Sequence, residues 1–172
     1  TIEAVGLFGN LSGATVRNLV IGSNSSVTST NSSAQIGSVA GLLTKSRILN
    51  CTNHMPVSSP GGTNVYVGGI IGRMNVSGYI GGCKNYGEVS NPGSVGGITA
   101  STSYTLISRN YSKDNGGKSG ENGVAFTVLT DEQLKSEALL KELTANAGYE
   151  NALSGGVLGA TAWKLGEEGY PV

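Results

Sequence analysis

The chain has 172 residues, of which 28 are glycine and 13% are charged, and its formal net charge is zero. This length suffices for one domain with a sizeable core, and so few charges argue against an ordinary helical domain. Basic residues exceed acidic ones in residues 1–123, but they are dispersed and not interleaved with aromatic residues, so nucleic-acid binding is not expected. No stretch approaches the ~20 apolar residues of a membrane span.

Residues 4–99 contain four imperfect copies of one pattern, which indicates a repeat protein. The clearest copy has the apolar segments 65–71 and 79–83, separated by Gly, Asn and Ser, and closes with Val89. We align Gly69 of this copy with Gly6, Gly41 and Gly97 of the other three copies. The residues that follow these glycines are Leu7, Leu42, Ile70 and Ile98, and a second apolar row is Val16, Ile48, Ile80 and Ile107.

Short apolar segments separated by turn-forming residues predict an all-β fold, a parallel β-helix or β-solenoid of about four coils. Parallel strands stack about 4.8 Å apart, so equivalent residues of successive coils are expected to form ladders. The glycines would occupy one such ladder, where the missing Cβ permits close backbone approach or a positive φ.

A second unit is expected at residues 124–172, after a solenoid of residues 1–123. Residues 112–123 lack apolar side chains and indicate a linker. Thr130 and Gln133 form a capping-box pattern, which predicts a helix over about 131–146 that stops near Gly148. We expect this unit, which contains the single tryptophan Trp163, to lie on the final coil as a cap, because an open solenoid end exposes unpaired strand edges.

The repeats resemble the GLUG-type repeats of bacterial surface and secreted proteins. The segments that carry the resemblance are VGLFGNLSGATVRNLVIGSNSSV, SVAGLLTKSRILNCTNHMPVS and VGGIIGRMNVSGYIGGCKNYGEVS. The complete Gly-Leu-x-Gly form occurs at residues 6–9, whereas Thr44 and Ala100 replace the second glycine in the later copies as aligned here. The resemblance implies an exported module at the bacterial cell surface or outside the cell, monomeric and part of a longer chain. Some relatives carry such repeats beside a zinc protease domain that cleaves IgA antibodies, to which the resemblance does not extend.

Cys51 and Cys83 occupy equivalent places 32 residues apart. Stacking would permit a disulfide, but in-register neighbours rarely offer the required dihedral angle, so two buried thiols are favoured. His54 is the only histidine, which excludes a histidine-based zinc site, and it is expected in a solvent-facing turn.

The sequence favours a non-catalytic module, without cofactor or metal, that serves as a rigid spacer or adhesion surface for a host glycan or matrix protein. Polysaccharide cleavage would need grouped carboxylates, whereas the repeats hold few acids, and Glu88 and Asp114 fall in turn-like positions. A carbohydrate-active enzyme and an accessory region of a surface protease are the alternatives. The candidate ligand-binding residues are Tyr86 and Asn85, in one turn, and Lys45, Arg47 and Arg73, in neighbouring repeats.

Overall fold

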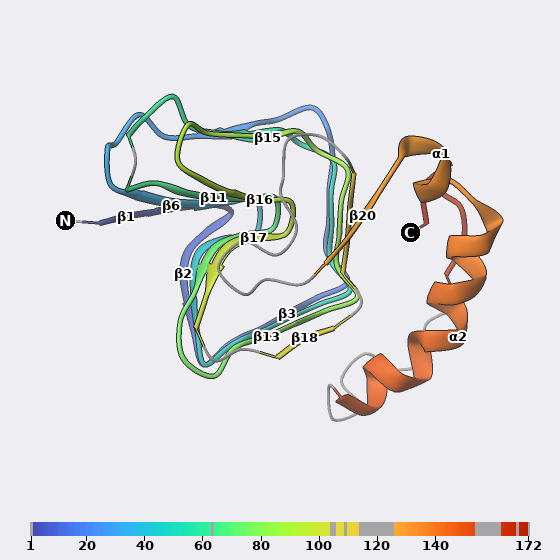
Figure 1. Cartoon of the computed structure of the whole chain (residues 1–172). Helices are drawn as coiled ribbons and strands as arrows, with labels where there is room; N and C mark the ends of the chain where they lie inside the picture. Colours follow the sequence, from blue (N-terminus) through green and yellow to red (C-terminus); the bar gives the residue numbers. More distant parts are fainter. Residues whose placement is uncertain are drawn as a thin grey trace.

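The computed structural model describes residues 2–62, 64–103, 106–108, 110–113, 126–153, 163–167 and 169–171. It confirms the parallel β-solenoid, in which three coils of five strands are followed by a fourth with four described strands (Figure 1). The first coil contains β1 (Glu3–Val5), β2 (Phe8–Ser12), β3 (Thr15–Arg17), β4 (Val20–Ile21) and β5 (Val27–Thr28). The second contains β6 (Ala34–Gly37), β7 (Ala40–Thr44), β8 (Arg47–Leu49), β9 (Thr52–Asn53) and β10 (Val57–Ser58).

The remaining strands continue the same order. The third coil contains β11 (Tyr66–Gly68), β12 (Ile71–Met74), β13 (Tyr79–Gly81), β14 (Lys84–Asn85) and β15 (Val89–Ser90). The fourth contains β16 (Ser94–Gly96), β17 (Thr99–Thr102), β18 (Leu106–Ser108) and β19 (Tyr111–Lys113). Stacking produces five parallel sheets, which we name in chain order sheet A (β1, β6, β11, β16), sheet B (β2, β7, β12, β17), sheet C (β3, β8, β13, β18), sheet D (β4, β9, β14, β19, β20) and sheet E (β5, β10, β15).

The solenoid has two hydrophobic cores. Sheets A and E enclose the smaller core, which includes Ile36, Val57, Val67 and Val89. Sheets B, C and D surround the larger core, which includes Ile48, Cys51, Ile71, Ile80 and Cys83. Viewed along the stack, sheet A folds inward between sheets E and B and so divides the cross-section into two lobes (Figure 1).

Glycines allow this inward fold because the backbones of sheets A and B touch there. An added Cβ at Gly41 would overlap the backbone of β1 and β6, and one at Gly72 would overlap the backbone nitrogen of Ile36. A second ladder of Gly37, Gly68 and Gly96 leaves equally little room against sheet B. A Cβ added at any of these glycines would force the two sheets apart, whereas the fourth coil has Ala100 in line with Gly72.

The sharp corner between sheets C and D depends on left-handed backbone. Between sheets C and D, Asn18, Asn50 and Gly82 have φ values of 54°, 52° and 64°. Asn and Gly are the residues that adopt this conformation most readily. The corner is further tied along the stack by a 2.8 Å hydrogen bond from Asn50 Nδ2 to Asn18 Oδ1.

The pairing confirms one predicted row and corrects the other. Ile48 is paired with Val16 and Ile80, and Ile80 with Ile107, as predicted. Leu42, however, is paired with Asn10 and Arg73. The residue in line with Ile70 and Ile98 is Val39, and Gly41 is in line with Gly72, so the second copy had been aligned three residues too far along the chain.

The reason for this misalignment is that Ser38 replaces the glycine that Gly69 and Gly97 supply in the later coils. The first coil is also one residue shorter at the bend between sheets A and B. Leu7 is in line with Val39, but it belongs to the largely exposed first coil and is 58% exposed, while Val39, Ile70 and Ile98 are fully buried.

The residues after the solenoid lie mainly along its side rather than across its end. β20 (Thr127–Leu129) extends sheet D beyond the fourth coil, and Phe126 packs against the larger core. The predicted single helix is two helices, α1 (Asp131–Leu134) and α2 (Glu137–Leu153), which flank sheet D (Figure 1). Thr130 and Gln133 form the expected capping box, but α2 continues through Gly148, because one interior glycine costs a helix only about 1 kcal/mol.

Asparagine and cysteine form stacked ladders on the inner face of sheet D. Asn53 Nδ2 donates a 2.8 Å hydrogen bond to Asn85 Oδ1 in the next coil. Cys51 and Cys83 are free, fully buried thiols, and the Cys51 backbone nitrogen lies 3.4 Å from Cys83 Sγ. Burial raises the pKa of the Cys83 thiol well above its usual range, so the folded chain disfavours the thiolate that reacts with alkylating agents.

Because both thiols are fully buried, neither cysteine should react with iodoacetamide in the folded protein. After unfolding in urea without reductant, both thiols become accessible, and mass spectrometry should show two carbamidomethyl groups per chain. A chain that accepts none until a reductant is added would instead contain a Cys51–Cys83 disulfide.

Replacement of Gly72 by alanine should lower the free energy of unfolding by about 2–3 kcal/mol, because the new Cβ overlaps the backbone of sheet A. Gly22 is the matched control, since an added Cβ there meets nothing within 4 Å and the residue is exposed. Urea unfolding should place Gly22→Ala within about 0.5 kcal/mol of the wild type. Equal effects of the two substitutions would contradict the close contact between sheets A and B.

Candidate functional site

The structure buries two of the residues predicted to bind ligand. Asn85 is fully buried in the asparagine ladder, and Tyr86 is only 7% exposed because the segment after the solenoid covers it. The ring of Tyr86 stacks on that of Tyr170 at 4.1 Å between centroids. The turn that had suggested an exposed sugar-binding surface is therefore part of the contact between sheet D and the C-terminal residues.

His54 belongs to the same contact and is not the solvent-facing turn residue that the sequence suggested. Its ring lies 4.9 Å from Tyr86 and 5.6 Å from Tyr170, measured between centroids. The Tyr170 hydroxyl donates a hydrogen bond to Asp131, which also forms ion pairs with Lys113 and Lys135 at 2.7 and 2.8 Å. These partners, with Lys113 the foremost, lower the pKa of Asp131. The groups are fully engaged in attaching the C-terminal residues to sheet D.

Lys84 is the most unusual residue of this contact, because its side chain has no exposed surface. Its Nζ atom lies 3.0 Å from the centre of the Trp163 ring and 3.4 Å from the carbonyl oxygen of Gly82, to which it donates. Burial lowers the pKa of Lys84 to about 7, while the ring of Trp163 favours the charged form. Sequence reasoning had identified Trp163 only as structural, and no local pattern marked Lys84.

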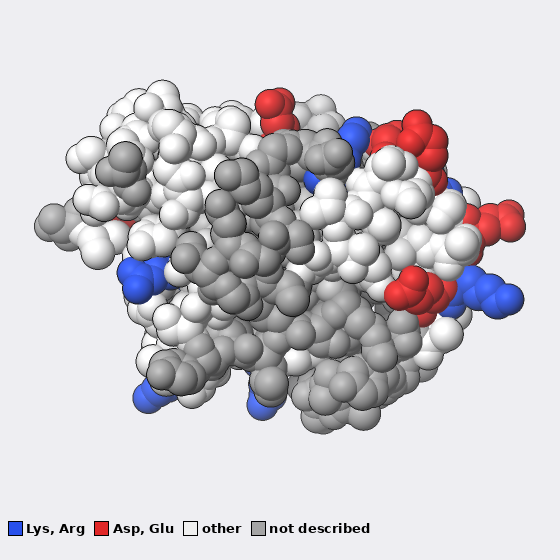
Figure 2. All heavy atoms as spheres, in the orientation of Figure 1, with Lys and Arg blue, Asp and Glu red and all other residues white. Residues whose placement is uncertain are grey.

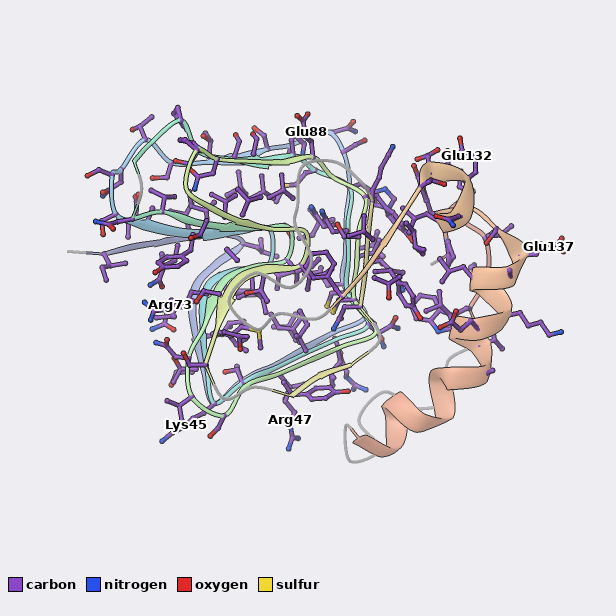
Figure 3. All side chains as sticks on the ribbon, viewed as in Figure 1. Lys45, Arg47, Arg73, Glu88, Glu132 and Glu137 are labelled. Atoms are coloured by element: carbon purple, nitrogen blue, oxygen red, sulfur yellow. The ribbon has the colours of Figure 1, made fainter. Side chains whose placement is uncertain are left out.

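The three predicted basic residues do not converge on one point. Arg73 extends from sheet B into the solvent-facing angle between sheets A and B, whereas Lys45 and Arg47 lie at and beyond the corner between sheets B and C (Figure 3). In the space-filling view, basic groups on the solenoid side are similarly separated, and acidic groups gather mainly near the helices (Figure 2). These residues thus give the solenoid a dispersed positive surface.

One of them has a defined setting, which we call the inside corner: Gln35 and Tyr66 of sheet A, with Leu42 and Arg73 of sheet B. Tyr66 is paired with Gln35, and Arg73 with Leu42, in adjacent coils. The Arg73 guanidinium carbon lies 5.3 Å from the centre of the Tyr66 ring. Tyr66 and Arg73 are half-buried, and Gln35 is 4% exposed. The inside corner is therefore the best candidate for a binding site on the described surface.

The described residues contain no cluster of three or more His, Cys, Asp or Glu side chains suited to a metal ion. Glu88 is exposed on sheet E, and Asp114 lies outside the described residues. Neither of the described helices is long and apolar enough to cross a membrane.

Comparison with known proteins adds no assignment. No protein-family model matches the chain, and neither a curated protein nor a solved structure matches it. The resemblance to GLUG-type repeats therefore remains a prediction from the residues quoted above.

The buried Lys84 predicts a specific pH dependence of stability. Its pKa is about 7 when folded and about 10.5 when unfolded, so the unfolded chain binds more protons between these values. The free energy of unfolding should accordingly fall as the pH is lowered from about 10.5 to 7. Lys84→Met should remove this component and stabilise the protein at pH 7 by about 1–3 kcal/mol.

Lys141→Met is the control, because Lys141 is exposed on α2. Urea unfolding between pH 7 and 10 should show the same pH dependence in this variant as in the wild type. If the free energies of unfolding of the wild type and Lys84→Met change in parallel with pH, Lys84 is charged in the folded state and the prediction is wrong.

Proposed function

We propose that the chain is a non-catalytic module of a larger bacterial surface or secreted protein, in which the solenoid provides a rigid surface for adhesion. The observation that carries the proposal is the in-register stack. Its inward residues form two closed cores, and its outer faces carry separated polar and basic side chains. Because each coil is fixed by its neighbours, such a surface holds its contact residues at constant spacing.

The likeness to GLUG-type repeats supports an exported location and membership of a longer polypeptide. The positive outer surface supports an anionic partner. A negatively charged host glycan or matrix protein is therefore favoured over a neutral one. The buried lysine and tyrosines beneath the C-terminal segment do not contribute to such a surface, since they are occupied by internal contacts.

An array of glycans and extracellular-matrix proteins tests the proposal. We expect the purified folded chain to bind members of at least one class, with the urea-unfolded chain as the negative control. Binding should weaken as salt is raised, because exposed charges are screened. If neither array is bound, adhesion is excluded and only the spacer role remains.

A parallel assay addresses the enzymatic alternative. Incubation of the chain with pectic, alginate and glycosaminoglycan polysaccharides should release no new reducing ends or unsaturated products. Release that is lost in a Glu88→Gln variant would replace the adhesion proposal by a carbohydrate-active enzyme.

A further inference from the structure

Two polar atoms at the inside corner lack the hydrogen bonds that buried groups normally make. Among the described residues, neither Gln35 Oε1 nor Arg73 Nε has a partner. A buried polar atom without a partner costs about 1–3 kcal/mol, and these two belong to adjacent coils of one surface. Gln35 Oε1 requires a donor and Arg73 Nε an acceptor.

The setting of Arg73 favours a planar anion. Its guanidinium lies over the Tyr66 ring, which restricts its orientation, and it forms no ion pair with a described residue. Glu3, the acidic residue in the strands of sheet A, is paired with the inward-facing Ala34 and accepts a hydrogen bond from Ser29. A guanidinium held in this way is suited to a carboxylate, which it can bind through two parallel hydrogen bonds.

The Gln35 amide adds a second requirement. Its enclosed oxygen can only accept a hydrogen bond, so an anion without a donor of its own, such as sulfate at neutral pH, does not satisfy it. A ligand that carries a hydroxyl group close to its carboxylate satisfies both atoms. The terminal amide torsion of glutamine is soft, so the oxygen can turn toward such a hydroxyl at little cost.

We propose that the inside corner binds an acidic sugar residue, with Arg73 holding the carboxylate and Gln35 accepting a hydrogen bond from a neighbouring hydroxyl. Tyr66 acts as a positioning residue that fixes the guanidinium. This proposal rests on the adhesion function and specifies the class of glycan and the place where it binds.

Calorimetric titration with a galacturonic acid oligomer tests the proposal, with a galactose oligomer of equal length as the uncharged probe. We expect the wild type to bind the acidic oligomer at least tenfold more tightly than the neutral one. Arg73→Gln should weaken binding of the acidic oligomer by about tenfold or more, as expected for loss of a charged hydrogen-bond pair. Arg47→Gln is the matched control, because it removes the same charge from an exposed site on sheet C.

The positioning role of Tyr66 has its own pair of variants. Tyr66→Phe keeps the aromatic face over which Arg73 lies and should retain binding, whereas Tyr66→Leu removes that face and should weaken binding several-fold. Urea unfolding of every variant establishes that it is folded at the temperature of the titration.

Equal losses in Arg73→Gln and Arg47→Gln would overturn the proposal, since they would indicate general charge attraction. Equal binding of a peptide with a free C-terminal carboxylate would overturn the choice of a sugar. If the arrays show binding that Arg73→Gln leaves unchanged, the adhesion function stands and this site is wrong. If the arrays show no binding, the adhesion function itself fails.

Discussion

The contact between the backbones of sheets A and B is the constraint on which the rest of the structure depends. A coil of about 30 residues without it would enclose one broad interior that its short apolar side chains could not fill. The inward fold of sheet A divides this interior into two cores, each narrow enough to be filled by Val, Ile and Leu. In the second and third coils glycine permits the contact, as Gly41 and Gly72 show, so the glycine spacing there follows from the shape of the coil and not from turns alone.

The C-terminal segment covers the outward side chains of sheet D. The outward side chains of this sheet include the long Lys84 and the rings of Tyr86 and Tyr111, which belong to the contact with the helical region. Leu134, Leu139 and Leu143 of the helices supply apolar surface there, and Glu142 accepts a 2.7 Å hydrogen bond from the Tyr111 hydroxyl. The cost of burying one ammonium group is offset in part by the Trp163 ring. This contact explains why the aromatic residues that looked like a binding surface are unavailable to a ligand.

The sequence was sufficient to predict the solenoid, because the apolar rows recur in every coil and no helical period competes with them. It also placed Val16, Ile48 and Ile80 in one column, since each lies the same number of residues before the corner between sheets C and D. It misplaced Leu42 because Gly41 was aligned with Gly69, whereas the residue in line with Gly69 is Ser38. The burial of Lys84 and Tyr86 could not be inferred, because it depends on segments about 50 to 85 residues later in the chain, and such contacts leave no local pattern.

The same backbone contact that divides the core also creates the inside corner. Tyr66 and Arg73 are seven residues apart, and they meet because the chain turns between β11 and β12 at Gly69 and Ile70. Every coil presents two residues at these places: Ala4 and Asn10, Gln35 and Leu42, Tyr66 and Arg73, Ser94 and Ser101. None of these side chains belongs to either core, so they can change without altering the fold. A solenoid of this cross-section can therefore vary the side chains that it presents at this corner from coil to coil while the backbone contact keeps its shape constant.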